Sequence, residues 1–260
     1  MRGAAWAIGW LAVALATSLP AHAQTAEDRR FCSDAAANVV FYLDLTTPYD
    51  AADEASLVSG IGRIFDSLEN GGRIVIRTME NTFSNSRRLL DMCVPYCKSS
   101  GLLNDIFFSD CTSGIVMSEK KKLKEAIKQA ISPLLRQAVE LPNSEIIRTI
   151  AQSAREEYRG GRANVFYVFS DMIENSAYLG GKTFFATATP DLMVKLKKDG
   201  LVPQLTGATI HVFGFGRGGN AAARAALPQD KLAKLNGFWL SYFQATGAQL
   251  SLEQNLSLAN

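Results

Sequence analysis

The hydrophobic positions along the chain fall into two alternating patterns. Short runs of β-branched and aromatic residues, without strict polar alternation, are typical of strands buried on both faces. They occupy residues 38–43, 73–79, 164–169 and 208–213. Between these runs, apolar residues recur every three or four positions, which is typical of helices. This second pattern occupies residues 57–68, 123–131, 146–154, 191–198 and 232–243. The alternation predicts an α/β fold with a doubly wound, mostly parallel sheet and helices on both faces.

Residues at the predicted helix ends agree with this interpretation. Asp50 can cap the first helix, and Gly71 and Gly72 can end it. Pro190, placed between Thr189 and Asp191, suits the first turn of the fourth helix. The aromatic residues between Phe238 and Phe243 have helical spacing, so we expect the last helix to pack into the core.

The first 23 residues have the pattern of a secretory signal peptide. Arg2 precedes an apolar run from Ala4 to about Leu15, and the segment ends in Ala21-His22-Ala23. The apolar run is shorter than the ~20 residues that a membrane-spanning helix needs, although an uncleaved anchor is the alternative. We therefore expect a bacterial periplasmic or secreted protein without a membrane span after cleavage. Residues 24–260 then form a single domain.

One segment, residues 80–118, interrupts the alternation with little periodicity and many small polar residues. It contains three of the four cysteines of the chain, which are Cys32, Cys93, Cys97 and Cys111. In an exported chain an even number of cysteines predicts disulfides, and three pairings are possible. We expect a loop insertion that the disulfides hold, and a bridge to Cys32 would fix it near the first strand. The spacing of Cys93 and Cys97 is not that of a common zinc or redox motif.

Charge excludes some partners. The 27 Lys and Arg residues nearly balance 25 Asp and Glu residues, for a net charge of +2. This near-neutrality does not favour binding to nucleic acid or to an anionic membrane. The helix near residues 118–131 carries five lysines, for which a solvated face is the default and an acidic partner the alternative.

The candidate chemistry lies where two predicted strands end. Asp44 follows the run Val39–Leu43, and Asp171 follows the run Asn164–Phe169. The carboxyl ends of parallel strands meet at one edge of the sheet, where ligands bind in doubly wound folds. Two acids at this edge, together with hydroxyls and water, are suited to a hard divalent cation.

At these residues the chain resembles the von Willebrand factor A domain family. The family motif D-x-S/T-x-S is matched by Asp44 and Thr46, its loop Ser or Thr by Ser144 in LPNSEII, and its later Asp by Asp171 in FSDMIENS. The resemblance covers about residues 38–247 and implies that these four residues bind Mg²⁺ or a similar cation. It also implies a protein-binding module in which an acidic residue of a partner protein completes the metal shell.

The resemblance has one departure and leaves one alternative. Pro48 occupies the third position of the motif, so water or Asp50 would have to supply that ligand. Glu174 and Asn175 are further candidates for the site because they follow Asp171 in the same loop. The alternative to a metal site is that Asp44, Thr46 and Asp171 only cap helices and organise loops.

The sequence offers three alternatives to a binding module, each an enzyme or a cofactor-binding function. Asp44 could be the nucleophile of a haloacid-dehalogenase-like, Mg²⁺-dependent phosphatase, but Thr46 stands where that family has its general acid. The glycine-rich segment Gly214–Gly219 follows the last strand instead of the first, unlike a dinucleotide-binding loop. His211 lies inside a predicted strand and no G-x-S-x-G segment occurs, which argues against a Ser-His-Asp hydrolase.

Overall fold

The computed structural model describes residues 31–97, 112–217 and 227–254. Within them, six strands form one sheet in the order β3-β2-β1-β4-β5-β6, and every neighbouring pair is parallel except β2 and β3. The strands are β1 (Asn38–Asp44), β2 (Arg73–Met79), β3 (Arg88–Cys93), β4 (Asn164–Phe169), β5 (Thr209–Phe213) and β6 (Gln249–Glu253). This arrangement confirms the predicted mostly parallel sheet.

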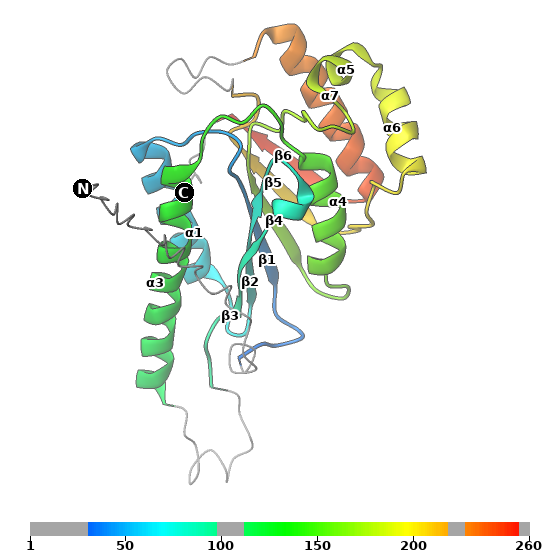
Figure 1. Ribbon diagram of the computed structural model, residues 1–260. Helices are drawn as coiled ribbons and strands as arrows, with labels where there is room; N and C mark the ends of the chain where they lie inside the picture. Colours follow the sequence, from blue (N-terminus) through cyan, green and yellow to red (C-terminus); the bar gives the residue numbers. More distant parts are fainter. Residues whose placement is uncertain (1–30, 98–111, 218–226, 255–260) are drawn as a thin grey trace, which may run out of the picture.

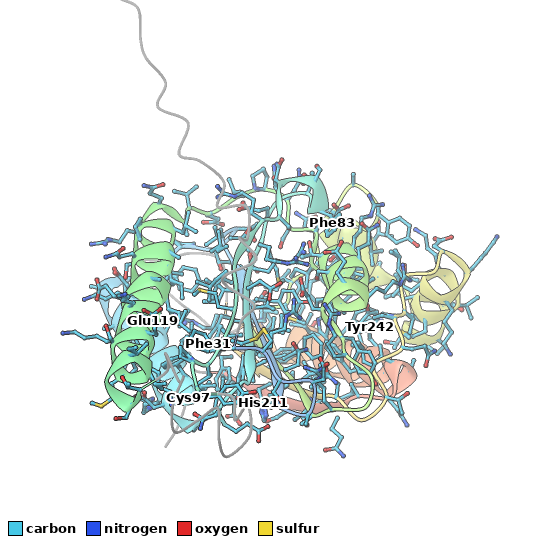
Figure 2. The ribbon with its side chains drawn as sticks, turned by 90° about the horizontal axis from the view of Figure 1, so that it is seen from below. Phe31, Phe83, Cys97, Glu119, His211 and Tyr242 are labelled. Atoms are coloured by element: carbon cyan, nitrogen blue, oxygen red, sulfur yellow. A yellow bond between two sulfur atoms is a disulfide. The ribbon has the colours of Figure 1, made fainter. Side chains whose placement is uncertain are left out.

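Helices cover both faces of this sheet, as predicted for a doubly wound fold. Helices α1 and α3 lie on one face and α4, α5, α6 and α7 on the other (Figure 1). Seen from below, Glu119 of α3 and Tyr242 of α7 lie on different sides of the sheet (Figure 2). The helices are α1 (Ala51–Ser67), α3 (Ser113–Gln137), α4 (Ile146–Glu157), α5 (Gly181–Ala186), α6 (Thr189–Lys198) and α7 (Gln229–Thr246), with a 3₁₀ turn, η2, at Phe83–Asn85.

Each face of the sheet has its own hydrophobic core, because successive side chains of a strand point to opposite faces. In β1, Phe41 packs with α1 and α3, whereas Tyr42 packs with the residues of α4 and α7. The aromatic residues of α7 are buried as expected, and the Trp239 indole N–H donates to the Met172 carbonyl at 2.9 Å. The core on the α7 side therefore contacts the loop that follows β4.

The segment predicted to be a loop insertion, residues 80–118, contains regular structure. Residues 88–93 form β3, the antiparallel edge strand, and α3 begins at Ser113. Cys93, the last residue of β3, is bonded to Cys32, so the expected bridge to Cys32 is present. Cys97 is also disulfide-bonded, and Cys111 lies outside the described residues. The disulfide thus joins the chain before β1 to the edge of the sheet.

A buried ionic network closes the amino edge of the sheet beside this disulfide. Arg73, at the start of β2, donates to both carboxylate oxygens of Asp91, at 2.7 Å each, and to Glu157 at 2.8 Å. Glu157 is fully buried and also accepts from Arg77 and Arg88. Because each buried charge has an opposite partner, the network fixes β2, β3 and α4 together without leaving an isolated ion.

None of the described helices is long and apolar enough to span a membrane. The predicted signal peptide, residues 1–23, lies outside the described residues.

Candidate functional site

The candidate site lies at the carboxyl edge of the sheet, between β1 and β4. These two strands are hydrogen-bonded neighbours in the middle of the sheet, and the chain leaves them in opposite directions, toward β2 and toward β5. This is the topological switch point, where loops diverge and leave a crevice for ligands. Asp44 ends β1, and Ser170 and Asp171 directly follow β4.

Asp44 is fully buried and its carboxylate is held by hydroxyl groups. Its Oδ1 accepts from the Thr46 backbone N–H at 2.9 Å and from the Thr46 hydroxyl at 2.6 Å. Its Oδ2 accepts from the Ser170 hydroxyl at 2.6 Å, and Ser170 Oγ in turn accepts from the Met172 N–H. The carboxylate therefore joins the loop after β1 to the loop after β4.

Asp171 is buried beside Asp44 and lies next to strained backbone. Its Oδ1 accepts from the Ile173 N–H at 2.8 Å, and the chain turns through Met172 at φ 61°. Met172 has the only positive φ of any described residue other than glycine. A left-handed conformation costs a residue with a Cβ roughly 1 kcal/mol, and such residues concentrate at functional sites.

Ser144 is fixed beside these two loops. Its backbone pairs in both directions with Asn175, at 3.0 and 3.1 Å, and three residues earlier the Leu141 N–H donates to the Thr46 carbonyl. The Ser144 hydroxyl is buried and has no hydrogen-bond partner among the described residues. A buried polar group without a partner costs about 1–3 kcal/mol, so this hydroxyl is a candidate for a ligand contact.

Glu174 and Asn175 position the site instead of extending it. The Glu174 carboxylate is 1% exposed and accepts from the Ile147 N–H at 2.9 Å, at the start of α4. The Asn175 side chain accepts from the Gly181 N–H and donates to the Pro142 carbonyl. Glu174 thus acts as a cap for a helix that has no cap from its own N-cap side chain, and both residues hold the Ser144 loop.

The site is electronegative. Burial raises the pKa of Asp44, and burial followed by the charge of Asp44 raises the pKa of Asp171 well above its ordinary value. At the end of β2, burial also raises the pKa of Glu80. Arg217 lowers the pKa of Asp171, and its guanidinium pairs with Asp53 at 3.4 Å. Two neighbouring buried carboxylates disfavour each other's negative charge, so their proximity favours the binding of a cation.

The oxygen atoms available in the site are of the kind that binds a hard cation. Oxygens with spare acceptor capacity are Oδ2 of Asp44, the Thr46 and Ser144 hydroxyls, and the carboxylate of Asp171. Oxygen ligands of this kind are those that Mg²⁺ takes, usually with several waters. Within the described residues, no cluster of three or more His, Cys, Asp or Glu side chains could hold a metal. The candidate set contains two such side chains, and its other two donors are hydroxyls.

The structure also bears on the departure at Pro48. Asp50 caps α1: its carboxylate accepts from the Asp53 N–H at 2.7 Å, and the Asp53 carboxylate accepts from the Asp50 N–H at 3.2 Å. Tyr49 lies between Pro48 and Asp50, and its hydroxyl donates to the Asp44 carbonyl at 2.7 Å. The side chains of Tyr49 and Asp50 are therefore engaged in structural contacts, so a metal site here would need water at the Pro48 position.

The sequence predicted Asp44, Thr46, Ser144 and Asp171 as the candidate site but not the other residues that the structure places among them. Ser170 bridges the two loops, and its place in the Ser-Asp pair after β4 was the available signal. No signal in the sequence pointed to Tyr49 or Met172 as residues of the site. In the glycine-rich segment, Gly216 has φ 69°, and a Cβ there would lie 2.4 Å from the Leu232 side chain. The left-handed backbone therefore favours glycine here, and the Leu232 methyl would have to move to admit a Cβ.

Comparisons with known proteins do not identify the chain. No family model matches it, and no curated protein matches its sequence. Among solved structures, it is similar to proximal thread matrix protein 1 from the mussel byssus, at 13% identity and a TM-score of 0.40 over 86% of this chain and 46% of that chain. It is also similar to the human COPII-coat protein Sec24c, at 13% identity and a TM-score of 0.38 over 86% of this chain and 30% of that chain. The chain thus spans less than half of either protein, and likeness at this level carries no inference about function.

Proposed function

We propose that the chain is an exported, von Willebrand factor A-like module that binds a partner protein through a divalent cation. Asp44, Thr46, Ser144 and Asp171 would hold Mg²⁺ or a similar ion at the carboxyl edge of the sheet. The observation that carries this proposal is the Ser144 hydroxyl, which is buried and has no partner in the described part of the chain. It lies on a loop that is hydrogen-bonded to the loops of Thr46 and Asp171.

The bound ion supplies an electrophilic position that a carboxylate of the partner can fill. The chain's own residues account for the remaining features of the site. The hydroxyls of Thr46 and Ser170 donate to Asp44 and keep its carboxylate oriented. The ion would also neutralise the two buried carboxylates, whose proximity raises the pKa of Asp171.

Export is part of the same proposal. The disulfide between Cys32 and Cys93 supports an oxidising compartment, because disulfides are rare in the cytosol. The signal peptide expected at residues 1–23 supports a periplasmic or secreted location.

The proposal is tested by calorimetric titration of Mg²⁺, Mn²⁺ and Ca²⁺ into the purified chain. Asp44→Ala and Asp171→Ala should abolish binding, because each removes a charged ligand. Asp191→Ala, an exposed acid in the first turn of α6, is the matched control and should bind as the unmodified chain does. Equal binding by all three variants would contradict the site.

Ser144→Ala separates a ligand role from a structural role. It should weaken metal binding by about tenfold or more. It should not lower the stability of the metal-free chain, because it removes a buried hydroxyl that has no partner. Loss of stability without loss of metal affinity would assign Ser144 to the fold alone. Metal-dependent hydrolysis of a phosphoester, lost in Asp44→Asn, would instead support the phosphatase alternative.

A further inference from the structure

A cavity of about 250 Å³ lies between α1 and α3, on the face of the sheet opposite α7. Gly62 of α1 lines it, and a Cβ built on this glycine would meet no atom within 4 Å. The lining residues are Val58, Gly62, Lys121, Lys124, Glu125, Ile127 and Lys128. We call this the α1–α3 groove. None of these lining residues belongs to the candidate metal site.

The groove has a net positive charge on one wall. Lys121, Lys124 and Lys128 lie three and seven positions apart in α3, so they share one face of the helix. Glu125 is the only acid among the lining residues. The two apolar lining residues, Val58 and Ile127, give the groove an apolar base beneath these charges.

The lysines of α3 differ in their contacts. Three are engaged: Lys120 with Asn70 at 3.2 Å, Lys122 with Glu119 at 2.8 Å and Lys124 with Asp66 at 2.5 Å. Lys121 and Lys128 have no ion-pair or hydrogen-bond partner of their side chains within the described residues. Two cations without partners beside an open cavity are what distinguishes the groove from a merely solvated helix face.

We propose that the α1–α3 groove binds an acidic segment of a partner protein, with Glu or Asp carboxylates paired to Lys121 and Lys128. The cavity has the size of one or two side chains, and its apolar base suits the methylene groups of a glutamate. A membrane surface is flat and contacts protruding residues, whereas these lysines line a hollow. A nucleic acid needs a broad basic surface, and the chain carries a net charge of only +2.

The test uses a fluorescently labelled decaglutamate peptide and measures its anisotropy with the purified chain at low salt. EDTA is present and the measurement is repeated in Asp44→Ala, so that the candidate metal site contributes nothing. The peptide should bind under both conditions, and binding should weaken with salt because the lysines are exposed. Failure to bind would overturn this proposal and leave the metal site untouched.

Two pairs of variants locate the binding. Lys121→Gln/Lys128→Gln should weaken it roughly fivefold to tenfold, as expected for the loss of two exposed ion pairs. Lys197→Gln/Lys198→Gln removes the same charge from α6, on the other face of the sheet, and should not weaken peptide binding. Gly62→Leu keeps every charge but fills the groove and should weaken binding similarly, whereas Gly237→Leu in α7, another glycine with open space around it, should not.

Thermal melting shows that each variant is folded. Equal weakening by the α6 variant would mean that only net charge matters, which overturns the proposal. The proposal is also overturned if Gly62→Leu binds the peptide as tightly as the unmodified chain does. Vesicles of phosphatidylglycerol and a single-stranded oligonucleotide are tested in parallel. Tighter binding of either than of the peptide, lost in Lys121→Gln/Lys128→Gln, would assign the groove to that partner instead.

Discussion

Glu174 shows how one buried side chain can connect the fold to the candidate site. It follows Asp171 by three residues, yet its carboxylate accepts from the N–H of Ile147, 27 positions earlier in the chain. Burial raises the pKa of Glu174 to about 7 from an ordinary value of 4.5. The hydrogen bonds from Ser176 and from the start of α4 lower this pKa, but less than burial raises it.

This shift predicts a pH dependence of stability. Between about pH 4.5 and 7, the folded chain holds a proton on Glu174 that the unfolded chain releases. The contribution of Glu174 to the free energy of unfolding therefore falls as pH rises through this window and is constant above it. The full change is about 3 kcal/mol. Glu174→Gln keeps an acceptor for the Ile147 N–H and removes the titration.

Urea unfolding at pH 5 and pH 8 measures this effect. The unmodified chain should lose more stability than Glu174→Gln between the two pH values. Asp44 and Asp171 also have raised pKa values, but they are present in both proteins, so their contributions cancel in the comparison. The same change with pH in both proteins would show that Glu174 does not titrate in this range.

At the scale of single elements, Asp50 caps the start of α1, and its variants show whether it also acts as a metal ligand. Asp50 and Asp53 form a capping box, in which each side chain accepts from the backbone N–H of the other. Asp50→Ala should lower the free energy of unfolding by about 1 kcal/mol, and Asp50→Asn by less, because Asn is also a good cap. Neither should change the affinity for Mg²⁺. A loss of affinity in Asp50→Asn, measured by titration, would show that Asp50 supplies the ligand that Pro48 cannot.

The strands that the sequence predicted, β1, β2, β4 and β5, are the four that lie in the interior of the sheet. Strands β1 and β2 are buried at every position, so their composition alone marks them. The edge strands β3 and β6 were not predicted, because most of their residues are partly exposed and show no alternation. Their strand conformation depends on pairing with β2 and β5, which no local pattern encodes.

The same reasoning explains what was predicted of the candidate site. Asp44 and Asp171 could be found because an acid directly after a buried strand is visible in the sequence. The left-handed backbone at Met172 could not be predicted, because methionine has no preference for this conformation. Glu174 was considered as a site residue, but its role as a cap for α4 depends on a contact between distant segments.

Across the whole molecule, the two edges of the sheet have different roles. The carboxyl edge carries the candidate site, with strained backbone at Met172 and the Ser144 hydroxyl, which is buried and unpartnered within the segments that the structure describes. The amino edge is closed by the Cys32–Cys93 disulfide and by the network around Arg73 and Glu157. A domain with this division can tolerate an energetically unfavourable site at one edge, because the other edge holds β1, β2, β3 and α4 together.

This division predicts that the disulfide matters for stability and not for ligand binding. Cys32 and Cys93 are 61 residues apart, so their bond restricts a long loop of the unfolded chain. Cys32→Ser/Cys93→Ser should lower the free energy of unfolding by about 4 kcal/mol on the loop-entropy estimate, measured by urea unfolding. Mg²⁺ affinity, measured by titration where the variant is still folded, should not change, since Cys93 pairs with Arg73 at the amino edge. A variant that is as stable as the unmodified chain, or a folded variant with weakened Mg²⁺ binding, would contradict this separation of the two edges.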